Sequence, residues 1–376
     1  MNAAAGAFDG LNKYIRITDI DEKSRCYIDE NPVSPKGELD DKYLVLENDI
    51  LFARTGASTG KTYLYKKSDG KLYFAGFLIR ISVNCDNNST FVYNATLTDR
   101  YNRWVRLTSM RSGQPGINSQ EYSSYKTYYP LLPEQNKIAS FLKKLDQRIE
   151  KQHQLVELLK SYKRGALSKL FPQKGETTPQ YRFVGFTEPW ELRKLGDMAD
   201  IVGGGTPSTI ISDYWNGDID WYSPAELSDQ IYLCSSQKKI TEQGYINSSA
   251  KMLPEGSVLF TSRAGIGKTA ILTRSACTNQ GFQSIVPHKG ELDSYFIYSR
   301  TEEMKAYGET AGAGSTFVEV SGKQMANMKL MMPKSIDEQK TIGDFFQRFD
   351  QSIVHHQSKL DGLLKVKSAL LQQLFI

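Results

Sequence analysis

Two Gly-Lys-Thr strings are the first residues of this chain whose spacing suggests a chemistry. They run from Gly60 and from Gly267, and a glycine-rich loop that ends in Gly-Lys-Thr can bind the phosphates of a nucleotide. Such a P-loop also needs a glycine five positions earlier, where this chain has Thr55 and Ser262. A nucleotide site is therefore disfavoured. A turn shared by both strings is favoured, either alone or with its lysines, Lys61 and Lys268, in contact with phosphates.

Polar side chains around these strings are further candidates for contact with a nucleic acid. Arg54 and Arg263 each follow a Leu-Phe strand just before a string, where a guanidinium group can contact a guanine edge or a phosphate. A surface salt bridge is the alternative for both arginines. Weaker candidates, in loops or at strand ends, are Lys13, Arg16, Gln114, Tyr222 and Thr316.

Residue patterns typical of catalysis or metal binding do not stand out. The histidines lack metal-ligand spacing. Cysteines at four scattered positions, Cys26, Cys85, Cys234 and Cys277, are predicted to be reduced core residues. Neither a run of about 20 apolar residues nor a signal peptide is visible. We therefore expect a cytoplasmic, non-enzymatic protein with no metal or cofactor of its own and no membrane contact.

The elements that must position these residues occur twice. Residues 133–171 and 337–375 match at a constant offset of 204 without a gap, and both carry a seven-residue apolar repeat. This period predicts two long helices that pack on each other, each roughly 57 Å long at about 1.5 Å per residue. The expected pairing residues are Leu142, Leu145, Ile149, Val156 and Leu159 on the first helix, and Phe346, Phe349, Ile353, Leu360 and Leu363 on the second.

Polar residues interrupt both apolar seams at equivalent places and should set their register. Gln152 and Lys163 stand on the first helix, and His356 and Lys367 on the second. The spacing of Ser335 and Glu338 also predicts a capping box at the start of the second helix.

The segments before the helices match as well, at offsets of about 203 to 208. They mix short β-rich runs with turn residues, which predicts two homologous α+β domains. The expected divisions are a first domain at 1–132, a helix at 133–172, a linker at 173–188, a second domain at 189–334 and a helix at 335–376. In the second domain about 27 residues, from Trp190 to Asn216, precede the shared Gly217, whereas nine precede its match Gly10 in the first. We therefore expect the first domain to lack an opening strand and loop.

The order of domain, long helix, domain, long helix resembles the specificity subunit of type I restriction-modification systems. The most specific local marks are Gly203-Gly204-Gly205-Thr206-Pro207-Ser208, the string from Tyr214 to Trp221, and Thr278-Asn279-Gln280-Gly281-Phe282. The resemblance implies two target-recognition domains that alternate with helices in an antiparallel coiled coil, with pseudo-two-fold symmetry. A net charge of +5 permits DNA binding without proving it.

The function implied by the resemblance is non-catalytic recognition of a two-part, asymmetric double-stranded DNA site. Partners would be methylation subunits, expected to be two, and restriction or translocase subunits, and these would carry S-adenosylmethionine, ATP and Mg. Glu134, Gln135, Glu338 and Gln339 lie where the family docks methylation subunits, although they can also be simple helix-start residues. The short first domain motivates an alternative, a truncated copy that binds methylation subunits without recognising DNA.

Overall fold

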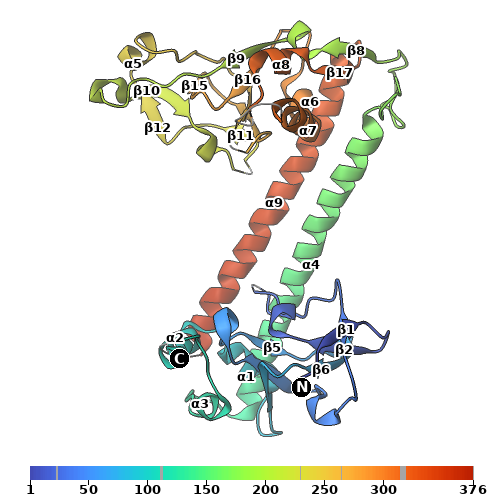
Figure 1. The fold of residues 1–376 in the computed structure, drawn as a ribbon, viewed down its shortest axis with the longest axis vertical. Coiled ribbons are helices and arrows are strands. Elements are labelled where there is room, and N and C mark those ends of the chain that lie inside the picture. Colours follow the sequence, from blue (N-terminus) through green and yellow to red (C-terminus); the bar gives the residue numbers. More distant parts are fainter. Residues whose placement is uncertain (23, 111–112, 229, 264, 314–318, 376) are drawn as a thin grey trace. The chain divides into compact units, whose positions relative to one another are not determined.

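A computed structural model describes residues 1–22, 24–110, 113–228, 230–263, 265–313 and 319–375. The chain divides into two compact units, of which unit 1 comprises Met1–Leu155 with His356–Ile376 and unit 2 comprises Val156–His355. Each unit holds one α+β domain and part of both long helices (Figure 1). The fold class expected from the repeat is confirmed.

The long helices are α4 (Leu132–Leu170) and α9 (Ile336–Leu374), and their bounds lie within two residues of those expected. In unit 1, Lys367 pairs with Asp146 at 2.7 Å and the Gln152 amide donates to the His356 carbonyl at 2.9 Å. Because the later residue of α4 meets the earlier residue of α9, the two helices run antiparallel there. All ten expected pairing residues are buried or half-buried.

Unit 2 contains a five-stranded sheet in the order β11-β14-β13-β16-β9, a three-stranded sheet β12-β10-β15 and the pair β17-β8. Its strands are β8 (Glu191–Lys194), β9 (Ala199–Gly203), β10 (Trp215–Tyr222), β11 (Tyr232–Leu233), β12 (Lys238–Ile240), β13 (Val258–Phe260), β14 (Thr269–Leu272), β15 (Cys277–Thr278), β16 (Gln283–Pro287) and β17 (Lys329–Met332). Its shorter helices are α5 (Glu242–Ile246), α6 (Ser294–Tyr298), α7 (Thr301–Gly312) and α8 (Gly322–Asn327). Helix α6 packs on β13 and β14. Helix α8 packs against β9 (Figure 1).

Unit 1 repeats part of this arrangement, with a three-stranded sheet β5-β4-β7 and the pairs β2-β6 and β1-β3. Its strands are β1 (Ala5–Ala7), β2 (Asn12–Ile15), β3 (Val33–Pro35), β4 (Asp49–Ala53), β5 (Thr62–Leu64), β6 (Lys71–Phe74) and β7 (Leu78–Ser82). Its shorter helices are α1 (Ser89–Ala95), α2 (Asp99–Ser109) and α3 (Ser119–Ser123). Helix α1 packs on β4 and β5, as α6 does on β13 and β14.

Strand pairings in the two units have the same register, which identifies the strands that are counterparts in the repeat. Ile50 faces Ile81 across β4 and β7, and Val258 faces Ile285 across β13 and β16. Strand β2 pairs parallel with β6, as β10 does with β15. The recurrence of both pairings shows that the sequence repeat is a structural repeat.

Two local predictions are wrong. Cys85 and Cys234 are exposed rather than buried, because they lie in loops outside the core, and only Cys277 among the four is buried. The capping box at the start of α9 does not form. The Ser335 hydroxyl accepts from the Asp337 backbone at 3.2 Å, whereas the Glu338 side chain turns to Arg182 at 2.7 Å.

In the part of the chain that the structure describes, no helix is apolar over enough length to cross a bilayer.

Candidate nucleic-acid interface

Each Gly-Lys-Thr string closes the turn of a β-hairpin. Strand β4 pairs antiparallel with β5, and β13 pairs antiparallel with β14, so each string leads from one strand into the next. In a P-loop the same string leads into a helix. The predicted turn between strands is therefore confirmed, and this topology does not provide the helix N-terminus on which a P-loop depends.

The glycine of each string is required by the turn. Gly60 and Gly267 have φ angles of 87° and 97°, a region that side chains rarely adopt. A Cβ at Gly60 would lie 2.4 Å from Val105, and one at Gly267 would lie 2.4 Å from Lys305. The turn thus needs glycine for both its backbone angle and its packing.

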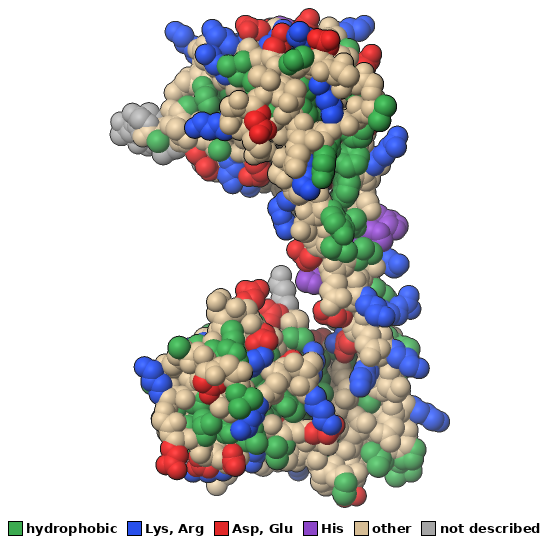
Figure 2. Space-filling view, turned by 90° about the vertical axis from the view of Figure 1, so that its right-hand side faces the viewer, with side chains coloured by type: hydrophobic (Ala, Val, Ile, Leu, Met, Phe, Trp, Pro, Cys, Tyr) green, Lys and Arg blue, Asp and Glu red, His purple; other side chains and the backbone are tan. Residues whose placement is uncertain are grey.

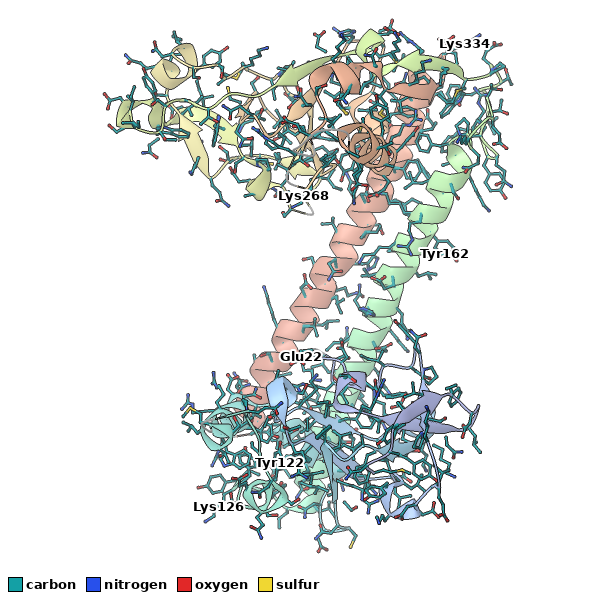
Figure 3. All side chains as sticks on the ribbon, in the orientation of Figure 1. Glu22, Tyr122, Lys126, Tyr162, Lys268 and Lys334 are labelled. Atoms are coloured by element: carbon teal, nitrogen blue, oxygen red, sulfur yellow. The ribbon has the colours of Figure 1, made fainter. Side chains whose placement is uncertain are left out.

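The lysine of each string hydrogen-bonds the equivalent neighbouring turn of its own unit. Lys61 Nζ donates to the Ile20 carbonyl at 3.1 Å, and Lys268 Nζ donates to the Leu227 carbonyl at 3.3 Å. The two differ in burial, because Lys61 is only 6% exposed whereas Lys268 lies on the surface (Figure 3). Lys61 is also held by Glu22 at 2.6 Å, and its hydrogen bond lowers the pKa of that carboxyl. Of the two lysines, Lys268 has the free surface that a phosphate contact requires.

Arg54 directly follows β4, Arg263 lies three residues after β13, and both side chains are exposed. Arg263 has a weak ion pair with Glu319 at 3.9 Å. Gln114 is exposed beside the turn that follows Arg54, with its amide 3.0 Å from the position of a Cβ at Gly56. These three polar groups therefore lie at or beside equivalent hairpin turns with exposed side chains.

The remaining candidates are more constrained. Lys13 pairs with Asp29 at 2.7 Å. Arg16 binds Asp19 through two hydrogen bonds, which raise the pKa of its guanidinium group. Tyr222 is buried, and burial raises its pKa to about 12, so its hydroxyl stays neutral inside the core. Thr316 lies outside the described residues.

The glycine-rich loop after β9 is packed tightly into unit 2. A Cβ at Gly204 would lie 2.0 Å from the Asn279 carbonyl, and one at Gly205 would lie 2.2 Å from Ser249. The Trp221 indole donates to the Gly205 carbonyl at 2.8 Å. Two of the motifs that marked the resemblance are thus joined by direct contact.

Charge does not locate the interface by itself. Figure 2 shows Lys and Arg side chains interspersed with Asp and Glu on the visible face of each globular part. Lys268 and Lys305 line a shallow groove of about 550 Å³ in unit 2 that also holds Glu302 and Glu309. The visible faces and this groove therefore do not form a uniformly basic surface.

The expected partner-binding residues at the helix starts have internal contacts. The side-chain Oε1 of Gln135 accepts from the Asn88 backbone N–H at 2.9 Å, and the Oε1 of Gln339 accepts from the Asp293 backbone N–H at 3.0 Å. Each glutamine thereby ties its long helix to the start of α1 or α6. Glu338 is buried, whereas Glu134 is exposed. The docking of methylation subunits on these four residues stays a prediction.

Sequence reasoning missed the partners of Glu338. Arg182 donates to its two carboxylate oxygens at 2.7 and 2.8 Å, and the hydrogen bond raises the pKa of the arginine. The Trp190 indole donates to the same carboxylate at 3.1 Å. The repeat could not reveal this contact, because the first half has no residues that match Arg182 and Trp190.

Comparison with known proteins gives a consistent result. A family model described as "Type I restriction modification DNA specificity domain" matches residues 5–160 and 187–364. The specificity subunit of the type I restriction enzyme MjaIX from Methanocaldococcus jannaschii is 35% identical over 190 residues, which are 50% of this chain and 44% of that subunit. The match thus spans less than half the length of that relative.

A putative MjaX specificity subunit from the same organism is 23% identical over 89% of this chain and 79% of its own length. Among solved structures, a type I restriction-modification S subunit from M. genitalium covers 98% of this chain and 89% of its own, with a TM-score of 0.64 at 14% identity. At that identity the structural likeness shows the fold alone.

Proposed function

Because the chain belongs to the type I restriction modification DNA specificity family, we propose that it recognises a two-part, asymmetric DNA site without catalysing a reaction itself. Each α+β domain would contact one half-site in the major groove, and the differing domains would give differing half-sites. The protein would act in the cytoplasm, where its DNA target is accessible.

One observation carries this proposal. The two units present the same hairpin turn, and an exposed arginine follows the first strand in each, Arg54 in unit 1 and Arg263 in unit 2. Around this shared frame the accessible side chains differ. Lys61 is buried, for example, whereas its counterpart Lys268 is exposed. A repeated frame with varied side chains is suited to recognising two different base sequences.

The chemistry would belong to partner subunits. Two methylation subunits with S-adenosylmethionine would methylate adenine at N6, which requires flipping the base out of the duplex. Restriction or translocase subunits would use ATP and Mg. Glu134, which is exposed at the start of α4, is the candidate with surface available for such a partner.

The test is long-read mapping of N6-methyladenine in cells that express this chain with its cognate methylation subunit. We expect two different short motifs separated by a fixed gap. A single motif, or a motif and its palindrome, would contradict recognition by unit 1. The absence of new methylation would contradict the proposal as a whole. The alternative of a non-recognising copy has no support from the family match, which extends through both domains.

A further inference from the structure

Helices α2 and α7 occupy the same place in the two units. In unit 1, the hydroxyl groups of Thr62 and Thr96 share a hydrogen bond of 2.8 Å just before α2 begins. In unit 2, those of Thr269 and Thr301 share one of 2.6 Å at the first residue of α7. Both helices also pack against the glycine of their Gly-Lys-Thr turn. Each hairpin of the candidate interface therefore has one helix beside its turn, and the two helices can be compared directly.

These equivalent helices carry opposite charges. Helix α2 contains three arginines and one aspartate, which give it a net charge of +2, and all four side chains are exposed: Asp99, Arg100, Arg103 and Arg106. Helix α7 contains three glutamates and one lysine, which give it a net charge of −2. Its exposed charged residues are Glu302, Glu303 and Glu309. The repeat thus keeps the position of the helix and inverts the charge of its outer face.

The three arginines of α2 form a cluster without acidic partners. They recur at every third residue and so lie on one side of the helix, whereas Tyr101 and Val105 on the other side are buried. None of the three has an ion pair with a residue that the structure describes. Neighbouring like charges weakly destabilise a helix. An anionic ligand on this face would offset that repulsion.

The unit with the basic helix lacks a free lysine at its turn. Lys61 of unit 1 is buried and paired with Glu22, whereas Lys268 of unit 2 lies on the surface. A positive charge is thus offered by the turn in unit 2 and by the helix beside the turn in unit 1. The arginines of α2 span six residues, or about 9 Å. Duplex DNA carries about five phosphate charges over that length.

We propose that the outer face of α2 binds the phosphate backbone of duplex DNA and that α7 makes no such contact. This inference rests on the proposed function and extends it, because it assigns the phosphate contacts of the two half-sites to different elements. Such contacts hold and orient a duplex without reading its bases. DNA is favoured over an acidic protein segment because α2 packs on the hairpin turn that Arg54 and Gln114 adjoin.

The test titrates duplex DNA that carries the mapped motif against the full chain with its cognate methylation subunit, at several salt concentrations. The triple variant Arg100→Gln, Arg103→Gln, Arg106→Gln should lower the slope of log binding constant against log salt concentration by about 2.7, which is about 0.9 per lost contact. Between about 50 and about 200 mM salt, the affinity of the unmodified chain should fall about 40-fold more than that of the variant. An unchanged slope would overturn the proposal.

Lysine at the same three positions should keep the slope, because a phosphate contact needs the positive charge more than the shape of the guanidinium group. This variant also controls for folding, since it alters the same positions. A slope as low with lysine as with glutamine would show that the loss does not come from charge, and would overturn the proposal.

Arg148→Gln is the matched control, because it removes an exposed arginine from another helix of unit 1. Its slope should equal that of the unmodified chain. A reduction as large as that for each arginine of α2 would show a general effect of net charge rather than a contact by α2. That outcome would overturn the proposal.

A second control tests whether this face binds a protein instead. Leu107 and Met110 are 64% and 74% exposed at the end of α2. Leu107→Gln with Met110→Gln should leave both DNA binding and assembly with the methylation subunit unchanged. Loss of assembly in this variant and in the glutamine variant of the arginines, with the salt slope retained, would identify a protein site and overturn the proposal.

Methylation mapping separates this inference from the proposed function. The glutamine variant of the arginines should methylate the same two-part motif as the unmodified chain, because phosphate contacts do not read bases. A changed motif would show that these arginines contact bases and would overturn the proposal. If the unmodified chain bound its motif no better than an unrelated duplex, DNA recognition itself would be contradicted. Specific binding with an unchanged salt slope would contradict only the role of α2.

Discussion

At the scale of single residues, the repeat places one residue type in two environments. Lys61 and Lys268 both hydrogen-bond a carbonyl of the neighbouring turn, yet only Lys268 lies on the surface. Arg54 and Arg263 are both exposed. Position in the repeat therefore sets the backbone contact, and burial decides which side chain remains accessible at the surface.

The substitution Arg263→Ala should relax only the half-site recognised by unit 2. Loss of a base contact by arginine costs about 1–3 kcal/mol of discrimination, and the arginine is not needed for the hairpin fold. Methylation mapping should show a degenerate position in one half of the motif, and Arg54→Ala should affect the other half. Lys334→Ala, which lies on another side of unit 2 from Lys268 (Figure 3), is the control and should change neither half. Relaxation of both halves by Arg263→Ala would contradict this assignment.

The substitutions Lys61→Met and Lys268→Met should separate stability from DNA affinity. Lys61→Met leaves the buried Ile20 carbonyl without its donor and should lower the stability of unit 1 by about 1–3 kcal/mol. Lys268→Met should change stability less and should reduce the salt dependence of DNA binding by about one phosphate contact. Hydrogen exchange and DNA titrations at several salt concentrations measure the two effects. The same salt dependence in Lys268→Met and the unmodified chain would exclude a phosphate contact by Lys268.

At the scale of elements, the long helices carry one ion pair twice. Lys163 on α4 pairs with Asp350 on α9 at 2.6 Å in unit 2, and their counterparts Lys367 and Asp146 pair at 2.7 Å in unit 1. The Asp350 side chain is 10% exposed and also accepts from the Tyr295 hydroxyl, whereas that of Asp146 is 40% exposed. Burial and Asp350 together raise the pKa of Tyr295. Of the polar positions predicted to set register, Gln152 and His356 face each other, whereas Lys163 and Lys367 each pair with an aspartate of the opposite helix.

Removing the lysine from each pair should have unequal effects. Lys163→Met leaves a buried carboxylate without its cation and should destabilise unit 2 by about 3 kcal/mol. Lys367→Met breaks a more exposed pair and should cost less than about 1 kcal/mol in unit 1. Hydrogen exchange of amides in each unit measures both values. Equal losses would show that the difference in burial does not control the strength of the pair.

At the scale of the whole molecule, the chain is a duplication with one divergent half. Both halves keep the hairpin, the helix that packs on it and the glutamine that ties this helix to α4 or α9. This shared frame predicts that domains can be exchanged between the two positions.

A chain in which residues 190–334 replace the first domain should recognise two copies of one half-sequence. The frame of the repeat is unchanged, whereas the side chains that contact bases become the same in both domains. Methylation mapping should replace the two different half-motifs with one half-motif present twice. Persistence of the original first half-motif would show that its recognition does not reside in the first domain.

The sequence by itself determined the duplication, the two long helices and the polar positions of their seam. These features are encoded in local periodicity and in a constant offset, and both can be counted without knowing which distant residues meet. The same reasoning identified a turn at each Gly-Lys-Thr string, because the missing glycine is visible at positions 55 and 262.

Only the tertiary structure decided which side chains are available. Glu338 was predicted to close a capping box, but Arg182 and Trp190, distant in sequence, bind its carboxylate. Tyr222 is buried although its position suggested a strand end that could face a ligand. Glu134 is exposed although its counterpart in the repeat, Glu338, is buried. The physical reason is that burial depends on contacts between segments far apart in the chain, which local patterns do not encode.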